Sequence, residues 1–201
     1  PRPWHTALGK WPPSPIKQPR RRLRQLLQQR SSWIPNNDKD NSDSNSKLVD
    51  RVHWREGSAM DLPWLASKLL AEKMNPVITD PSRFMLGTIG SERVACGQIR
   101  SIGDGYFELA SLYVEPSYRR KDIGSKAVHK LLERHVRETY GIEDGLFLLT
   151  LNKTTPFYES MGFSEVAIAE APPVMQAEFA IGTQVASIFA NDRLVVMKYS
   201  L

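Results

Sequence analysis

Blocks of apolar residues with strand-type and helix-type spacing alternate along the chain from residue 48 onward. Three of the short apolar runs are separated only by glycine-containing turns, which predicts an antiparallel meander. The meander strands are expected over 84–89, 94–102 and 106–114, and one earlier strand over 52–55. Between this first strand and the meander, leucines at near-helical spacing predict a helix that begins at Asp61 and ends at Asn75-Pro76.

A strand–helix–strand unit overlaps the end of the meander. The apolar positions of 123–140 fall at offsets of 4, 5, 8, 9 and 13 from Ile123, which is the spacing of an amphipathic helix. Residues 146–151 are almost continuously apolar, as expected of a parallel strand buried on both faces. The last predicted elements are a helix over 156–161, strands over 165–169 and 194–199, and between them a helix with a weak point at Gly182. The predicted fold class is therefore α/β (α+β), with a mixed central sheet that combines an antiparallel meander and a βαβ core, flanked by helices.

The first 47 residues differ in composition from the rest of the chain. Residues 1–37 hold eight Lys or Arg, no Asp or Glu, and seven of the 14 prolines, whereas the remaining residues carry 19 basic and 22 acidic groups. The run 36–46 contains no apolar residue, so it cannot bury enough surface to offset its ordering entropy. We expect a basic, Pro-rich disordered arm with a polar linker over 1–47 and one folded domain over 48–201.

The arginine-rich arm has three interpretations. It resembles an organellar transit peptide, which indicates a plastid or another organelle, although it is poor in serine for such a leader. A solvated tail on a cytoplasmic protein and a contact with RNA or the ribosome are the other two. No apolar run approaches the roughly 18 residues of a membrane span, so no membrane partner is expected. The single cysteine, Cys96, excludes a disulfide framework and a multi-cysteine metal site.

Candidate chemistry is concentrated where the strand 106–114 leads into the helix that begins at Ile123. This junction contains three successive basic residues, 119–121, and Gly124. A helix N-terminus has unpaired N–H groups and partial positive charge, and a glycine there lets a ligand approach the backbone closely. The junction is therefore either a site for a pyrophosphate group or an ordinary turn with solvated arginines.

The stretch 54–163 resembles the GNAT superfamily of acyl-CoA-dependent N-acyltransferases. In that family's pyrophosphate loop an Arg or Gln is followed by Gly three residues on and by Gly or Ala five residues on, and Arg119, Asp122 and Gly124 occupy these places. The segment 156–163, Pro-Phe-Tyr-Glu-Ser-Met-Gly-Phe, looks like the family's helix ending in Gly-Phe. Asp122 departs from the pattern: aspartate tolerates a left-handed backbone, but its carboxylate would repel a pyrophosphate or cap the helix itself.

The resemblance implies the GNAT fold, acetyl-CoA as cosubstrate and no metal, in a member that the arm suggests is organellar. It further implies transfer of an acetyl group to a primary amine (a protein N-terminus, a lysine or a small amine) by direct attack in a ternary complex. The implied acetyl-CoA-binding residues are Leu112, Tyr113, Val114, Arg119, Arg120, Lys121, Asp122, Ile123, Gly124, Ser125, Asn152 and Tyr158. The alternative is a non-catalytic GNAT-fold module that binds acyl-CoA or a protein partner. The sequence identifies neither the acceptor nor the oligomeric state.

Two side chains are candidates for proton transfer. Tyr158 matches the family's general acid, which protonates the departing thiolate, and a packed aromatic is the alternative. Glu108 lies on the strand where family members often place a carboxylate and is the candidate base. Strict alternation puts Glu108 on the face of Leu112 and Val114, and a bulge would change that parity. Asn152 either bonds the pantetheine arm or caps its own loop.

Overall fold

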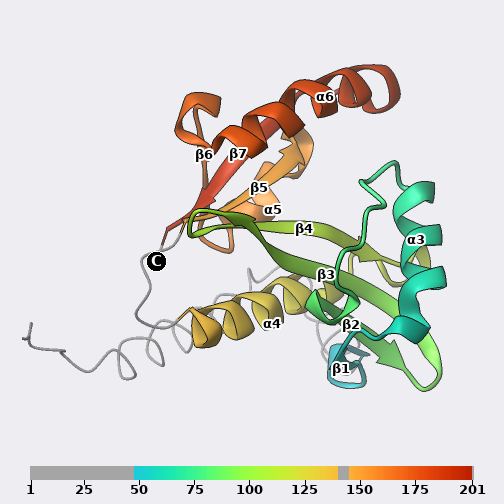
Figure 1. Ribbon diagram of the computed structural model, residues 1–201. Helices are drawn as coiled ribbons and strands as arrows, with labels where there is room; N and C mark the ends of the chain where they lie inside the picture. The colour runs from blue at the N-terminus through green and yellow to red at the C-terminus, as the bar shows by residue number, and fades with distance from the viewer. Residues whose placement is uncertain (1–47, 140–144, 201) are drawn as a thin grey trace, which may run out of the picture. The chain divides into compact units, whose positions relative to one another are not determined.

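The computed structural model describes residues 48–139 and 145–200, so the predictions for the arm 1–47 lie outside the described residues. These residues form a seven-stranded sheet with the order β1-β2-β3-β4-β5-β7-β6 (Figure 1). Its strands are β1 (His53–Glu56), β2 (Phe84–Ile89), β3 (Glu92–Gly103), β4 (Tyr106–Val114), β5 (Gly145–Leu151), β6 (Phe163–Val166) and β7 (Leu194–Tyr199). The helices are α3 (Leu62–Ala71), α4 (Ile123–Glu138), α5 (Thr155–Glu159) and α6 (Pro173–Ala190).

The sheet is mixed, as the sequence predicts. Strands β1 to β4 pair in antiparallel order, which confirms the meander. β4 pairs parallel with β5, and α4 connects them, which confirms the βαβ core. β7 then inserts between β5 and β6 and pairs antiparallel with both.

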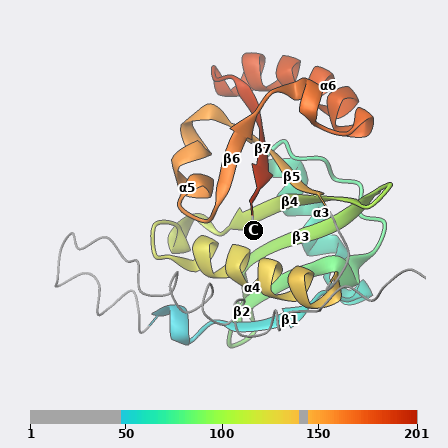
Figure 2. The same cartoon turned by 90° about the vertical axis from the view of Figure 1, so that its left-hand side faces the viewer.

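Helices cover both faces of the sheet. α4 packs on one face against β2, β3 and β4, and its fully buried Val128 and Leu131 share a core cluster with Tyr158 of α5. α3 covers the opposite face, where Leu65 and Leu69 pack with Phe84 of β2. Figure 2 shows α4 in front of the sheet and α3 behind it. α6 lies on the α3 face, over β5 and β7.

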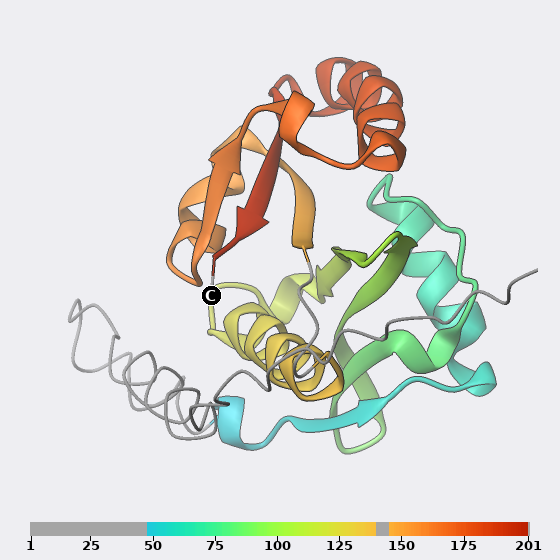
Figure 3. The same ribbon diagram turned by 60° about the vertical axis from the view of Figure 1, so that its left-hand side comes forward.

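Strands β4 and β5 stay paired over only part of their length. The parallel register joins Tyr106–Glu108 to Gly145–Phe147, while β4 continues to Val114 and β5 to Leu151. Figure 3 shows the two strands diverging beyond the paired stretch. We call this the fork, and it separates the meander from the β5-β7-β6 part of the sheet.

A bulge in β4 lies just beyond the base of the fork. Ala110 pairs with Gln98, but Tyr113, three residues on, pairs with Cys96, only two residues from Gln98. The extra residue is Ser111, whose backbone has a φ of 58°, and its Oγ accepts a hydrogen bond of 3.2 Å from Gln98 Nε2. The alternation therefore reverses at this point.

Two elements, α3 and β6, depart from their predicted bounds by three residues or more, and the predicted weak point at Gly182 does not interrupt α6. α3 ends at Ala71, because Lys73 adopts a left-handed φ of 60° and the N–H of Met74 turns back to the carbonyl of Leu69. β6 spans Phe163–Val166 rather than 165–169. α6 runs unbroken through Gly182, where a Cβ would come within 2.9 Å of Leu194 Cδ2, so this glycine permits close packing of α6 on β7.

Candidate functional site

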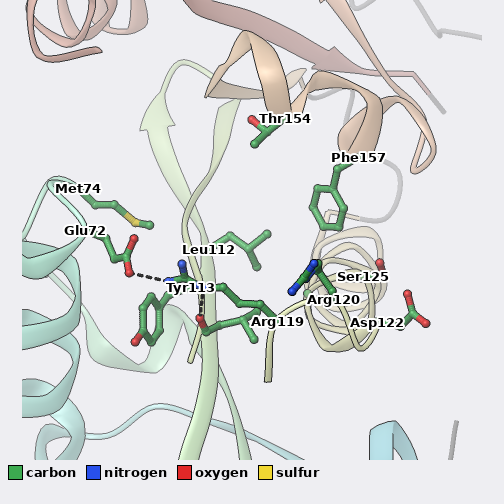
Figure 4. A pocket seen from close by; sticks show the side chains of 12 residues that line it. Glu72, Met74, Leu112, Tyr113, Arg119, Arg120, Asp122, Ser125, Thr154 and Phe157 are labelled. Carbon is green, nitrogen blue, oxygen red and sulfur yellow. Dashed lines mark hydrogen bonds and ion pairs between the residues drawn. The ribbon is translucent and has the colours of Figure 1, made fainter. Parts of the chain in front are cut away.

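A cavity of about 500 Å³ opens at the end of β4, beside the first turn of α4. It is lined by three kinds of segment: the end of β4, the loop and helix start at 119–125, and residues from the α3 and α5 regions. The lining residues are Glu72, Met74, Leu112, Tyr113, Val114, Arg119, Arg120, Asp122, Gly124, Ser125, Thr154 and Phe157. Figure 4 shows Phe157 and Ser125 on one side of the cavity and Glu72 with Met74 on the other.

The backbone of the loop before α4 is tightly turned. Arg120 and Asp122 have φ values of 59° and 58°, in the left-handed region. Asp122 is the N-cap residue of α4, yet its carboxylate makes no capping hydrogen bond. The sequence-based alternative in which Asp122 caps the helix with its own oxygen is therefore not what the structure shows. The first N–H groups of α4 therefore receive no bond from the Asp122 side chain, and Gly124 and Ser125 of this turn line the cavity.

Gly124 provides a direct test of whether a ligand fits here. A Cβ built at Gly124 would lie 3.6 Å from Phe157 Cζ and 3.6 Å from Val114 Cγ2, which are ordinary contacts. The protein's own packing therefore does not require glycine at this position. A side chain there would instead occupy cavity volume between Val114 and Phe157. With the α4 N-terminus and two arginines alongside, this open surface suits a phosphate-bearing ligand.

Arg119 is held across the cavity by two partners. Its Nε donates to the carbonyl oxygen of Val114 at 2.8 Å, and its Nη2 forms an ion pair with Glu72 Oε1 at 2.5 Å (Figure 4). Glu72 follows the last residue of α3, so this pair ties α3 to the loop. The four charged lining residues are two arginines and two acids, Glu72 and Asp122, and their formal charges cancel.

A second carboxylate, Glu115, fixes the end of β4 to α3. It accepts a hydrogen bond of 2.9 Å from the Tyr113 hydroxyl and pairs with Lys68 Nζ at 2.5 Å. Burial acts to raise the pKa of Glu115, but the bonds from Lys68 and Tyr113 outweigh it and lower that pKa. Glu115 therefore anchors the end of β4 to Lys68 of α3.

Tyr158, the predicted acid, is not among the residues that line the cavity. It is 9% exposed and packs between Phe157 and Phe163. Burial raises the pKa of its phenol to about 12, and a hydrogen bond with Thr150 acts in the opposite direction. Thr150 Oγ1 lies 2.6 Å from Thr154 Oγ1, and Thr154 does line the cavity. Hydroxyl groups thus connect Tyr158 to the cavity wall.

Glu108, the predicted base, lies at the base of the fork, as the last residue of β4 that pairs with β5. The Ser111 bulge puts it on the face of Tyr113 instead of that of Leu112 and Val114, which corrects the prediction from strict alternation. Its carboxylate is buried and pairs with Arg100 at 2.6 Å. Burial raises the pKa of Glu108, and Arg100 only partly offsets this.

Eight of the predicted acetyl-CoA-binding residues line the cavity: Leu112, Tyr113, Val114, Arg119, Arg120, Asp122, Gly124 and Ser125. The other four, Lys121, Ile123, Asn152 and Tyr158, are not among the lining residues. Lys121 Nζ donates to the carbonyl of Ser117, Ile123 is 1% exposed in the core, and the backbone carbonyl of Asn152 accepts from Thr155 Oγ1. Sequence reasoning missed Glu72, Met74, Thr154 and Phe157. Of these four, Phe157 lies within the recognised segment 156–163, so the sequence contained a signal that could have identified it.

The residues that the structure describes contain neither a metal-binding cluster nor a membrane-spanning helix. No group of three or more His, Cys, Asp or Glu side chains is arranged to hold a metal ion in the part of the chain that the structure describes. No helix among residues 48–139 and 145–200 combines the length and the apolar character needed to cross a bilayer.

Sequence and structure comparisons give the same answer about the fold. The Acetyltransferase (GNAT) domain matches residues 80–165, which include β2 to β5, the cavity loop and α5. No curated protein matches the sequence. The mixed seven-stranded sheet flanked by helices is the GNAT fold.

Solved structures from several bacteria resemble this chain in fold. Rv2747 from Mycobacterium tuberculosis, in complex with CoA and NLQ, aligns with a TM-score of 0.55 and 18% identity over 74% of this chain and 99% of its own. Escherichia coli ElaA aligns with a TM-score of 0.53 and 18% identity over 74% and 99%. N-acetylglutamate synthase from Neisseria gonorrhoeae, complexed with coenzyme A and L-arginine, aligns with a TM-score of 0.52 and 18% identity over 75% of this chain. This chain spans only 34% of that synthase.

Proposed function

We propose that the protein is an N-acetyltransferase that moves an acetyl group from acetyl-CoA to a primary amine by direct attack in a ternary complex. The observation that carries this proposal is the cavity at the end of β4, which meets the N-terminus of α4 at the open surface of Gly124. Neighbours of the same fold that were solved with CoA support it.

In this reaction the amine nitrogen bonds to the acetyl carbon as the carbon–sulfur bond breaks. The amine gives up a proton, and the thiolate of CoA takes one. Arg119, Arg120 and the first N–H groups of α4 would bind the diphosphate. Glu108 is proposed to accept the amine proton and Tyr158 to supply the proton to sulfur.

The proposal is tested in two stages on the full chain. Isothermal titration with acetyl-CoA measures binding, and a thiol-release assay over a library of peptides, lysine derivatives and small amines measures transfer. We expect binding, and CoA release that depends on an added amine and yields its N-acetyl product by mass spectrometry. Acetyl-CoA that does not bind, or release that ignores the amine, would contradict the proposal.

A second candidate is a GNAT-fold module that binds acyl-CoA without turnover. The observation in its favour is that Tyr158 lies outside the cavity lining and that Glu72 and Asp122 balance the charge of the two arginines. It predicts binding of acetyl-CoA with no CoA release for any amine of the library.

Gly124→Val should weaken acetyl-CoA binding. The added side chain occupies cavity volume between Val114 and Phe157, and overpacking of this kind costs about 1–3 kcal/mol, or roughly 5- to 150-fold in Kd. Isothermal titration measures the change. Gly124→Ala adds only the Cβ and should have a smaller effect, and Lys130→Val, on the solvent side of the same helix, should have none. Unchanged affinity in Gly124→Val would place the ligand elsewhere.

Asp122→Gly should bind acetyl-CoA more tightly than the native chain, by up to roughly fivefold. The change removes a negative charge from the cavity lining, and glycine adopts the observed φ of 58° without strain. Asp122→Asn separates the two causes, because asparagine keeps the left-handed preference and loses only the charge. Weaker binding in both variants would mean that the carboxylate holds the loop in shape.

A further inference from the structure

Three charged side chains from three different elements meet at the base of the fork. Arg100 of β3 pairs with Glu108 of β4 through both Nε and Nη2, at 2.7 and 2.6 Å. The same Nη2 also bonds both carboxylate oxygens of Glu178, on α6, at 2.9 and 3.1 Å. One guanidinium is therefore shared by two carboxylates, and the cluster carries a net charge of −1 when both acids are ionised.

The two carboxylates differ in their surroundings. The side chain of Glu108 is 6% exposed, while that of Glu178 is 33% exposed. Among the described contacts of Glu108, Arg100 and Glu178 are the charged groups that face it. Glu108 is buried on the Tyr113 face of β4, and Tyr113 lines the cavity. Glu178 is the only charged residue of α6, a helix of 18 residues that is otherwise apolar or neutral.

Resting on the proposed function, we propose that Glu178 is a positioning residue that makes Glu108 able to accept the acceptor's proton by competing with it for Arg100. Burial raises the pKa of Glu108, but the pair with Arg100 acts to lower that pKa and so weakens Glu108 as a base. Because Glu178 pairs with the same nitrogen, its carboxylate still balances the positive charge of Arg100 after Glu108 takes a proton. The net charge of the cluster then changes from −1 to zero. The negative charge of Glu178 acts to raise the pKa of Glu108, which favours uptake of a proton by Glu108.

The proton transfer balances within the cluster. An ammonium group at the acceptor gives its proton to the Glu108 carboxylate and becomes a neutral amine, whose lone pair then attacks the thioester carbon. Arg100 remains protonated throughout, and its hydrogen bonds to Glu178 persist. α6 is thereby part of the chemistry of the acceptor side and not only a cover for β5 and β7.

The test follows Glu108 directly, by carbon-13 NMR titration of the glutamate carboxyl groups in the full chain. The Glu108 signal is identified by its loss in Glu108→Gln. In Glu178→Gln its midpoint should move to lower pH, because a negative neighbour is gone and Arg100 serves Glu108 alone. Glu178→Asp, which keeps the charge, should restore most of the native midpoint. Glu133→Gln, a surface carboxylate on α4 that pairs with Lys130, should leave it unchanged.

A packing effect is separated by Met175→Ala, which loosens α6 at a residue that is 1% exposed but keeps Glu178. If this variant moves the Glu108 midpoint as far as Glu178→Gln does, the effect comes from the seating of α6 and the proposal is overturned. An unmoved midpoint in Glu178→Gln also overturns it.

Kinetics then distinguish this proposal from the proposed function. In an active enzyme the acidic limb of the pH profile of kcat/KM should follow the NMR midpoint to lower pH in Glu178→Gln. A limb that stays in place would remove Glu108 as the base. A shifted NMR midpoint in a protein that acetylates no amine would support the coupling within the cluster and contradict the acetyltransferase assignment.

Discussion

Replacing Tyr158 by phenylalanine should lower kcat for acetyl transfer by roughly 10²–10⁴-fold, the contribution of a positioned acid, while KM for acetyl-CoA changes little. The phenol has a pKa of about 12, so it keeps its proton over the whole working range of pH. A thiolate whose acid has a pKa near 8.5 takes that proton only when the two groups are held together. Steady-state kinetics with saturating amine measure the loss.

Thr150→Val is the matched control for this prediction. It removes the hydrogen-bond partner of Tyr158 and leaves the phenol in place. Tyr158→Phe should lose about 1 kcal/mol of stability, the net value of one hydrogen bond. Thr150→Val should lose at least as much, because it also removes the bond between the Thr150 and Thr154 hydroxyls. Thr150→Val should retain much more of kcat. If Tyr158→Phe retains it too, Tyr158 is a packed aromatic, as its place between Phe157 and Phe163 also allows.

The sequence predicted the order of elements because the periodic positions are those that become buried. In α4, the residues Ile123, Val128 and Leu131 are at most 1% exposed, and the continuous apolar run of β5 lies between β4 and β7. The cavity loop was predicted for the same reason: it is one continuous segment between a recognisable strand and a recognisable helix. Local pattern is sufficient where the site is local.

Contacts between distant segments were not predictable. Glu72 reaches Arg119 across 47 residues, and Glu178 reaches Arg100 across 78. Positive φ values at Lys73 and Ser111 end α3 early and reverse the alternation of β4, yet neither position is a glycine that would indicate the turn. Tertiary packing selects these conformations, so no single window of sequence contains the signal.

Asp61 is a buried charge whose contacts with distant strands were likewise not predictable from the sequence, and its removal should destabilise the fold. The sequence predicted only that a helix begins there. In the structure its carboxylate is 0% exposed and accepts from Arg55 of β1 at 2.7 and 2.8 Å and from Arg93 of β3 at 2.7 Å. The backbone N–H and hydroxyl of Ser58 bond the same carboxylate. Asp61 thus joins the start of α3 to two strands.

Asp61→Asn should lower the free energy of unfolding by about 2–3 kcal/mol, below the 3–5 of a fully buried pair because the two arginines are partly exposed. That loss corresponds to a fall of about 5–10 °C in Tm.

The bonds from Arg55, followed by those of Arg93 and Ser58, hold the pKa of Asp61 well below its usual range. The unfolded chain therefore binds this proton first as pH falls, so the native protein should lose stability progressively below about pH 4. Asp61→Asn should lose less stability over the same pH range. Asp104→Asn, at an exposed turn with a φ of 51° that asparagine also adopts, is the control. An equal loss there, or an unchanged acid limb in Asp61→Asn, would show that the carboxylate does not hold β1 and β3 to α3.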